Sequence, residues 1–395
     1  MLSGWHVHAR GYAEELRKMP DVGITAVWDE LPERGKQWAA ELNVPFEPDL
    51  LTFVRRGDVD AVVVDAPTDR HAEVMVAAAK AKKHIFTEKV MALTVRECDE
   101  IAEAVRNASV KFCISFPART VSKHLFAKRA ADEKLIGDVT FLRVRVAHNG
   151  ASGGWLPPHF YDPIQCGGGA MMDLGAHPMY LARWLGGKPL KVSSTFNYFT
   201  EHAVEDNAVS VIEFENKCIG VAETSFVASR SPDCLELHGT AGSLFIGGPE
   251  DQVRIFSEKT DGAVRGWVRP ADLPQALPRP IRIWVSGILE GTPIPFGPEE
   301  GSQLTALMEA AYLSHKQGSA AVPVSRGAVF DMFEFVDEEV QNPIVVGYGD
   351  EGLGPRPRNR EVGVYGNRIS GLRGTRGNHP SVPIRHDAPR HRRRS

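Results

Sequence analysis

The run VDAVVVD at Val59–Asp65 decides the fold that this sequence predicts. Its apolar side chains follow one another almost without alternation, which is typical of a strand buried on both faces of a parallel sheet. We expect an alanine-rich helix over His71–Ala81 and another strand over His84–Thr87. Because strand, helix and strand follow in that order, the sequence predicts a doubly wound parallel sheet, which binds ligands at the carboxyl ends of its strands.

The same alternation continues on both sides of this run. Strands are expected at Gly23–Asp29 and Val110–Ser115, with a short apolar piece at Val44–Phe46. The helices expected between them are Ala9–Met19, Pro32–Leu42, Leu50–Arg56 and Val95–Asn107. The sequence therefore predicts a Rossmann-like dinucleotide-binding domain over residues 1–116.

The first strand of that domain is an anomaly. A dinucleotide fold needs a central strand before its first turn, but only Met1 and Leu2 precede the turn around Gly4. Without that strand, its two neighbours would keep unpaired backbone groups, which are costly when buried. The sequence therefore predicts a first strand that is missing, because the natural chain begins upstream or has been truncated.

The turn that follows is the candidate phosphate site, although it lacks the spacing G-x-G-x-x-G, and an ordinary strand-to-helix turn is the alternative. Its candidate cofactor-binding residues are Ser3, Gly4, Trp5 and His6. Asp29 ends the second strand, where a carboxylate can bind the adenine ribose hydroxyls. A carboxylate there would repel a 2′-phosphate, so NAD is favoured over NADP. A solvated turn aspartate is the alternative for Asp29.

Two later turns lie at the carboxyl ends of predicted strands. The turn after Asp65 should line the crevice, and it offers to the cofactor Ala66, Pro67, Thr68 and His71. The next strand ends in Glu88 and Lys89, also candidate cofactor contacts, and the lysine could reach a substrate oxygen. A loop with helix caps and an exposed, ion-paired lysine are the alternatives.

A different domain is expected over residues 117–330. A helix at Val121–Leu135 precedes seven strand-like segments: Val139–His148, Lys191–Thr200, Ala208–Glu215, Ile219–Phe226, Cys234–His238, Gly242–Ile246 and Val253–Ser257. Many strands with few helices predict an open, mostly antiparallel sheet with helices on one face. A second subunit is the usual cover for the other face, so a homodimer or homotetramer is expected.

A late helix is expected at Glu299–His315, and residues 331–395 are expected to form a disordered tail. From Gly347 onward the composition is rich in Gly, Pro and Arg. The basic run Arg392–Arg394 is only a weak hint of nucleic-acid binding. An altered reading frame would give the same composition.

The composition of the 395-residue chain is that of a globular protein, with 43% hydrophobic residues and a net charge of −4 that gives no reason to expect a polyanion partner. Its five cysteines are scattered and form no C-x-x-C pair, which favours reduced thiols in the cytoplasm over disulfides or a metal site. No signal peptide or membrane-spanning run is visible, so no membrane partner is expected.

The segment GGGAMMDLGAH at Gly167–His177 places a carboxylate, Asp173, four residues before an imidazole, His177. Histidine is the side chain best suited to move a proton near neutral pH. A glycine turn that feeds an amphipathic helix, with Asp173 as its cap, is the alternative. Pro178 disfavours helical backbone at His177, so the helix is expected to begin at Pro178 and the pair to meet through a turn.

Together these motifs resemble the Gfo/Idh/MocA family of NAD(P)-dependent oxidoreductases over about residues 1–325. Thr87–Lys89 is similar to the family's E-K-P motif, with Val90 in place of proline, and Gly167–His177 to its G-G-G-x-x-x-D-x-G-x-H segment. The other segments that fit are Pro67–His71, Phe116–Arg119, Glu205–Asn207, His238–Gly242 and the late helix. Tyr180 stands where many members carry a second aspartate.

The resemblance implies a catalytic site of Lys89, Asp173 and His177. A hydride would move between the nicotinamide and a sugar, cyclitol or related polyol, and His177 would exchange the hydroxyl proton. Lys89 would bind the reacting oxygen, and Asp173 would orient the pair. Besides Lys89 and His177, the candidate substrate contacts are Arg119, His148, Trp155 and His159, with surface histidines as the alternative for His148 and His159.

Two other functions stay open from the sequence. One is a non-catalytic regulatory protein that binds dinucleotide or sugar on the same fold, as fold alone does not fix function. The other is a lyase or glycosidase that uses bound NAD for transient redox chemistry.

Overall fold

The computed structural model describes residues 1–259 and 266–325. Its N-terminal part contains the predicted parallel sheet, in the order β1 (Ala61–Val64), β2 (His84–Thr87) and β3 (Phe112–Ile114). All of these residues except Ala61 and His84 are buried, as the unbroken apolar pattern of the first strand predicted. The Rossmann-like sheet is thereby confirmed.

The segment at Met1–Ser3 lies where the central strand was expected. Leu2 forms parallel bridges with Trp28 on one side and Val64 on the other. The strand predicted at Gly23–Asp29 is reduced to bridges at Val27 and Trp28, because Met1–Ser3 offers it only a short partner. The three residues nevertheless hold the chain in register, since the Leu2 amide donates to the Val63 carbonyl at 2.8 Å.

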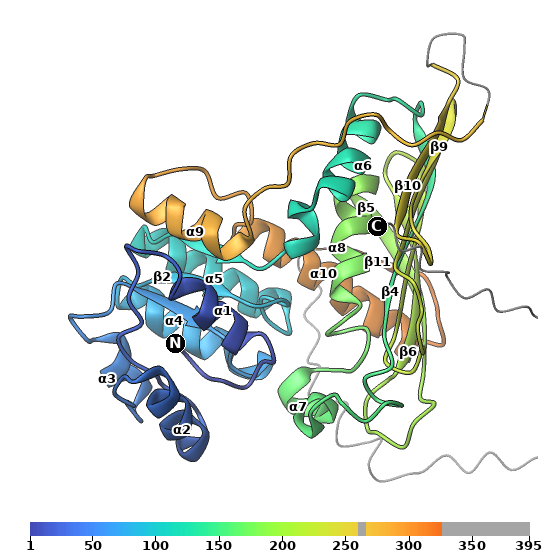
Figure 1. The fold of residues 1–395 in the computed structure, drawn as a ribbon. Helices are drawn as coiled ribbons and strands as arrows, with labels where there is room; N and C mark the ends of the chain where they lie inside the picture. The colour runs from blue at the N-terminus through green and yellow to red at the C-terminus, as the bar shows by residue number, and fades with distance from the viewer. Residues whose placement is uncertain (260–265, 326–395) are drawn as a thin grey trace, which may run out of the picture. The chain divides into compact units, whose positions relative to one another are not determined.

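Helices surround this sheet (Figure 1) close to their predicted positions. Their bounds are α1 (Ala9–Leu16), α2 (Pro32–Leu42), α3 (Leu50–Val54), α4 (His71–Lys80) and α5 (Val95–Ala108), with a 3₁₀ turn η1 at Thr68–Arg70. The start of α5 is fixed by a capping box in which Thr94 and Glu97 bond each other's backbone amides. These helix ends bring the turns after β1 and β2 to the same edge of the sheet.

The second sheet has eight strands in the order β10-β9-β8-β4-β7-β6-β5-β11. Their bounds are β4 (Val139–Ala147), β5 (Pro189–Asn197), β6 (Asn207–Phe214), β7 (Ile219–Ser225), β8 (Cys234–Gly239), β9 (Gly242–Gly247), β10 (Gln252–Ser257) and β11 (Val322–Pro323). Neighbouring strands are antiparallel except β4 and β7, which run parallel. Alternate residues of β6 are buried and exposed, which confirms a sheet with one covered face.

The helices of this part are η2 (Pro117–Thr120), α6 (Ser122–Asp132), η3 (Pro158–Tyr161), α7 (Pro163–Cys166), α8 (Ala176–Gly186), α9 (Pro280–Leu289) and α10 (Pro298–Lys316). Figure 1 shows α6 and α8 on one face of the large sheet, whereas α9 lies beside the parallel sheet, where it contacts β2 and β3. Helix α8 packs on β4 and β7. Helix α10 contacts β5 of this sheet and also α5, a helix of the N-terminal part. The chain therefore returns after the large sheet to cover the parallel one.

Three features of this half differ from the expectations. Helix α8 begins at Ala176, two residues before Pro178, because proline is compatible with the first turn of a helix. Helix α9 and the short α7 were not predicted. The tail expected at 331–395 lies outside the described residues, so its expected disorder and the hint of nucleic-acid binding at its basic end stay predictions. In the described ranges no helix is long and apolar enough to cross a membrane.

Glu309 offers a test of the packing between α10 and α5. It is 8% exposed, and burial raises the pKa of its carboxyl to about 7, against a hydrogen bond from the Val95 amide that lowers it. The folded protein thus holds this proton more tightly than the unfolded chain does, and stability falls as the pH rises from about 4.5 to 7.

We expect Glu309→Gln to raise the free energy of unfolding at pH 8 by about 1–2 kcal/mol and to change it far less at pH 5. Urea unfolding of both proteins at the two pH values measures this difference. Glu103→Gln, at an exposed position of α5, is the control and should leave stability nearly unchanged. An equal effect of Glu309→Gln at both pH values would contradict the assignment.

Candidate active site

An ion pair between Lys89 and Asp173 joins the two halves of the described chain. Lys89 follows β2, and its ammonium donates to Oδ1 of Asp173 at 2.5 Å and to the Asp173 backbone carbonyl at 3.1 Å. The lysine side chain is 2% exposed. The structure therefore brings together two of the three residues that the resemblance implies as catalytic.

Each partner fixes the charge of the other. Burial alone would lower the pKa of the Lys89 ammonium, but the Asp173 and Glu88 carboxylates raise it. Burial alone would raise the pKa of Asp173, but Lys89 and His6 hold it well below its usual range. Both groups are therefore charged at neutral pH, and the site holds a positively charged hydrogen-bond donor.

His177 lies in the first turn of α8 and is neutral. Burial and, to a smaller extent, the Lys89 ammonium lower the pKa of its imidazole to about 3, while Asp173 opposes this. Its Nδ1 lies 2.9 Å from the hydroxyl of Tyr180, which accepts the Ala118 amide at 3.1 Å. Tyr180 thus orients the imidazole of His177 through a hydrogen bond. An aspartate at position 180 would also attract the ring through its negative charge.

We expect Tyr180→Phe to lower kcat about 10-fold to 100-fold, because both the Ala118 amide and Nδ1 of His177 would lose their partner. Leaving such groups unpaired costs about 1–3 kcal/mol. Tyr180→Asp should instead raise the pKa of His177 and shift the pH profile of kcat/KM. Tyr161→Phe, whose ring stacks on His202, is the control. An unchanged kcat in Tyr180→Phe would contradict this positioning role.

The glycine run before Asp173 is held by Glu205, on the segment before β6. The carboxylate of Glu205 accepts the amides of Gly169 and Met171, each at 2.9 Å, and the hydroxyl of Tyr312 at 2.6 Å. The Asp173 amide in turn donates to the Gly169 carbonyl at 3.0 Å. Asp173 is therefore positioned by a turn before α8, as predicted, whereas His177 lies inside the helix and not before it.

The predicted nucleotide turn is close-packed. Trp5 is 4% exposed, stacks on Phe160 at 5.1 Å and donates its indole N–H to Gln165 at 2.9 Å. Oγ of Ser3 accepts the Trp5 amide at 3.1 Å. The structure thus uses Trp5 to join the turn to η3 and α7, and a role in cofactor binding stays a prediction for these residues.

Asp29 lies beside that turn and is 1% exposed. Its carboxylate accepts the Gly4 amide at 2.9 Å and the Leu31 amide at 2.8 Å, and it pairs with Arg34 at 2.8 Å. The alternative of a solvated turn aspartate is wrong, because Asp29 is buried and fully engaged. The contact of Asp29 with the ribose stays a prediction. In such a contact the carboxylate would bind the ribose while it also pairs with Arg34.

The turn after β1 is held by His71. Its ring lies 3.0 Å from the Val90 carbonyl through Nδ1 and 3.1 Å from the Ala66 carbonyl through Nε2, and it is 2% exposed. Pro67 precedes η1, which Thr68 begins. His71 therefore ties the Ala66–Thr68 turn to the loop that carries Lys89, and the contact of these residues with the cofactor stays a prediction.

Not all the predicted substrate contacts lie at the ion pair. Arg119 places its guanidinium over the rings of Trp184 at 5.0 Å and Phe296 at 5.2 Å. His148 directly follows β4 and stacks on Phe226, with the ring centroids 5.1 Å apart. Besides burial, which lowers the pKa of His148, Asp173 raises this pKa and Lys89 lowers it.

Trp155 packs on His148 with a ring separation of 4.7 Å and is 55% exposed. His159 lies 5.0 Å from Trp5. The charges of Asp173 and Lys89 therefore act on the pKa of His148, which places this predicted substrate contact close to the ion pair. Arg119 is instead held among aromatic rings.

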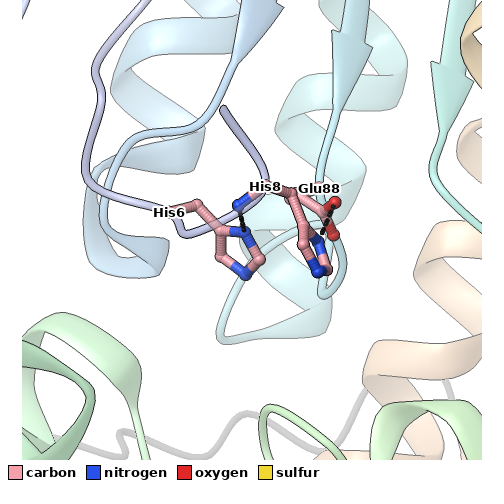
Figure 2. Close-up of side chains that lie close together, drawn as sticks. All are labelled: His6, His8 and Glu88. Carbon is pink, nitrogen blue, oxygen red and sulfur yellow. Dashed lines mark hydrogen bonds and ion pairs between the residues drawn. The ribbon is translucent and has the colours of Figure 1, made fainter. Parts of the chain in front are cut away.

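Figure 2 shows a cluster of three side chains, His6, His8 and Glu88, that lie close together. Nδ1 of His8 lies 2.9 Å from Oε1 of Glu88, which also accepts the Tyr12 hydroxyl. Nε2 of His6 lies 4.0 Å from Oδ1 of Asp173. The Glu88 carboxylate therefore orients His8, and the contact of Glu88 with the cofactor stays a prediction.

Sequence reasoning missed the residues that act through another side chain. They are His8, Tyr12, Gln165 and, as an anchor of the glycine run, Glu205. The first of these had a signal in the sequence, because His6 and His8 form an H-x-H pair directly before a helix. The others carry no local signal, because their partners are more than 30 residues away.

Comparison with known proteins agrees with this geometry. A family model described as "Oxidoreductase family, NAD-binding Rossmann fold" matches residues 4–116, and one for the GFO/IDH/MocA C-terminal domain matches residues 124–245. The chain belongs to the Gfo/Idh/MocA family. It is therefore an oxidoreductase of an NAD-binding family, and the resemblance drawn from its motifs is confirmed.

Among the relatives of this Gfo/Idh/MocA chain is the scyllo-inositol 2-dehydrogenase (NAD(+)) of Bacillus subtilis, 29% identical over 62% of this chain and 72% of the relative. The myo-inositol 2-dehydrogenase of Thermotoga maritima is 27% identical over 63% and 75%. A levoglucosan dehydrogenase solved with NADH and L-sorbose has a TM-score of 0.73 at 20% identity, over 82% of this chain and 98% of that one. The relatives act on sugars and cyclitols, and the solved structure supports the same fold.

NAD is the cofactor of this family, and the turn before α1 fits part of it. Nε2 of His6 is buried without a hydrogen-bond partner in the described part of the chain, as expected of a group that awaits a ligand. His8 adds a second imidazole beside it, with the ring centroids 4.6 Å apart. These residues and the Ala66–Thr68 turn are the groups that would hold the dinucleotide.

Proposed function

We propose that this protein oxidises a secondary hydroxyl of a sugar, cyclitol or related polyol, or reduces the corresponding carbonyl. The observation that carries the proposal is the Lys89–Asp173 ion pair at the carboxyl end of β2, with His177 in the electrostatic reach of both. NAD supplies the hydride acceptor or donor when bound. The protein's part is then to bind the hydroxyl and to move its proton.

Lys89 binds the reacting oxygen in this proposal. Its ammonium is kept charged by Asp173, so it can stabilise the negative charge that develops on the oxygen as the proton leaves. Asp173 keeps the ammonium in place through two contacts, one from its carboxylate and one from its backbone carbonyl. The contact of the ammonium with the reacting oxygen is the one that is stronger in the transition state than with the neutral alcohol.

His177 exchanges the hydroxyl proton. Its low pKa keeps it neutral, so Nε2 can accept a proton while Nδ1 donates to the oxygen of Tyr180. The resulting imidazolium gives its proton up to water readily, which restores the base. Proton transfer by a positioned group contributes roughly 10²–10⁴-fold to a rate.

A cavity of about 240 Å³ adjoins His177 and supports a polyhydroxyl substrate. Its polar lining comes from Lys123, His124, Arg145 and Asp233, and its apolar lining includes Leu174 and Leu181. Donors and acceptors spread around an apolar wall suit a sugar ring, which carries hydroxyls at its edge and C–H groups on its faces.

The test follows absorbance of reduced nicotinamide when the purified protein is mixed with NAD and a panel of inositols and aldoses. Turnover that His177→Ala abolishes, with unchanged NAD binding, is the expected result. NAD binding without turnover on any member would support a regulatory protein. A product with no net change in reduced nicotinamide would support transient redox chemistry.

We also propose that the open face of the large sheet binds a second copy of the chain. Val209 and Val211 of β6 and Ile219 of β7 are each at least 40% exposed on this face. We expect Val211→Glu to lower the molar mass measured by light scattering to that of one chain. Val7→Glu, at an exposed position of the N-terminal part, is the control and should leave it unchanged.

A further inference from the structure

The backbone amides of the turn before α1 are already used inside the protein. In dinucleotide folds such amides and the following helix N-terminus bind the diphosphate. Here five of them donate to internal acceptors: the amides of Ser3, Gly4, Trp5, His6 and His8. These five amides are therefore not available to a diphosphate, which would draw on further donors at this helix.

His6 offers one such donor. Its Nδ1 accepts the His8 amide at 3.2 Å, which leaves the proton of the neutral ring on Nε2. Burial lowers the pKa of this imidazole and keeps it neutral. Nε2 has no hydrogen-bond partner within residues 1–259 and 266–325, and its 4.0 Å separation from Asp173 is too long for a hydrogen bond. An acceptor supplied by a ligand would satisfy it.

His8 offers a second donor and a charge. Its Nδ1 is held by Glu88, so Nε2 is free to face outward, and the side chain is 49% exposed. Figure 2 shows the Nε2 atoms of both rings on the same side, away from the bonds that hold the rings, and the ring centroids lie 4.6 Å apart. The two imidazoles thus form a fork that opens beside the N-terminus of α1.

We propose that this fork, and not the amides of the turn, binds the diphosphate of the dinucleotide. The inference rests on the proposed function, because it takes a dinucleotide as the ligand of the turn. Hydrogen bonds to the diphosphate from a neutral imidazole, His6, and a protonated one, His8, replace those from the amides of a glycine-rich loop. The missing glycines then reflect another way of binding the same group.

The groups around His8 make its charge depend on pH. Burial alone would lower the pKa of His8, but the Glu88 carboxylate raises it, Asp173 acts in the same direction, and Lys89 and His6 oppose it. Tyr12 faces the ring from α1 at 6.3 Å. Diphosphate affinity should therefore be greatest where His8 is protonated and should fall as the pH rises.

A divalent cation is the competing occupant of the cluster, and its hydrogen bonds disfavour it. The ligand atoms of His6, His8 and Glu88 lie within 4.8 Å of one another. However, Nε2 of His6 carries a proton, and Glu88 already accepts from Tyr12, His8 and the Lys89 amide. Because these three groups already donate or accept hydrogen bonds, the cluster suits an anion better than a metal ion.

The test is calorimetric binding of ADP-ribose, which carries the diphosphate without the nicotinamide, and of adenosine, which lacks it. We expect His8→Gln to weaken ADP-ribose binding about 10-fold at pH 6.5 and to leave adenosine binding within twofold. The wild-type affinity for ADP-ribose should fall about 10-fold between pH 6.5 and 8.5, and that of His8→Gln should not. His238→Gln, on β8, is the matched control.

His6→Gln should also weaken ADP-ribose binding, with a smaller dependence on pH. Unchanged binding in both variants would overturn the proposal, as would a wild-type protein that does not bind ADP-ribose. Stoichiometric Zn²⁺ binding that both variants abolish, with ADP-ribose binding intact, would assign the cluster to a metal instead. Turnover is a separate readout: variants with intact ADP-ribose binding and turnover refute only the fork, whereas binding as expected without turnover refutes only the proposed reaction.

Discussion

Lys89→Met is expected to lower kcat about 10²–10⁴-fold while the dissociation constant for NAD changes by no more than a few fold. The ammonium of Lys89 is the one positive group within hydrogen-bond distance of Asp173 in the described part of the chain. Methionine keeps the length and the apolar contacts of the side chain but cannot bind an oxygen that gains negative charge. Stopped-flow measurement of the hydride step and titration of NAD separate the two effects.

The partner variant sharpens this prediction. Asp173→Asn keeps the shape of the site but removes the charge that raises the pKa of Lys89, so that pKa should fall. The lysine would lose its charge at a lower pH, and the upper limb of the kcat profile should move in that direction. Lys36→Met, on an exposed part of α2, is the control. A Lys89→Met protein with full kcat would show that the reaction does not use this group.

The fold could be predicted from the sequence because its signals are local. The buried run of β1, the alternation of β6 and the capping residues of α5 each lie within a few residues of the element that they specify. The strand at Gly23–Asp29 was only partly correct, because a strand also needs a partner and its neighbour here is Leu2. Pairing of that kind is a long-range property.

Only part of the candidate site could be predicted, because only some of its residues belong to local motifs. Lys89, Asp173 and His177 belong to motifs that can be read along the chain. Glu205 and Tyr180 act by holding other residues, and a hydrogen bond between Gly169 and Glu205 spans 36 positions. The sequence indicates which groups can do chemistry, whereas the groups that fix their orientation depend on how the turns meet.

The turn that carries Asp173 depends on the small size of Gly169, and Gly169→Ala is expected to disrupt it. A Cβ built at this position would lie 2.1 Å from the backbone oxygen of Glu205 and 2.9 Å from Cβ of Val204. Neither atom is the end of a flexible side chain, so the backbone itself must shift. Overpacking of this kind costs about 1–3 kcal/mol.

The same shift should reach the chemistry. Gly169 donates its amide to Glu205 and accepts the amide of Asp173, so a displaced turn moves the carboxylate that holds Lys89. A misplacement of about 1 Å can cost roughly 10²-fold in rate, and we expect at least that loss in kcat. Thermal unfolding and steady-state kinetics measure the two consequences in one preparation.

Gly11→Ala is the matched control, because a Cβ at this position of α1 meets nothing within 4 Å. In a helix, alanine is favoured over glycine by about 0.5–1 kcal/mol, so this variant should be slightly more stable and fully active. Opposite signs for the same substitution would separate crowding at the Asp173 turn from the general effect of replacing a glycine. A Gly169→Ala protein as stable and active as the wild type would mean that Glu205 does not hold the turn closely enough to position Asp173.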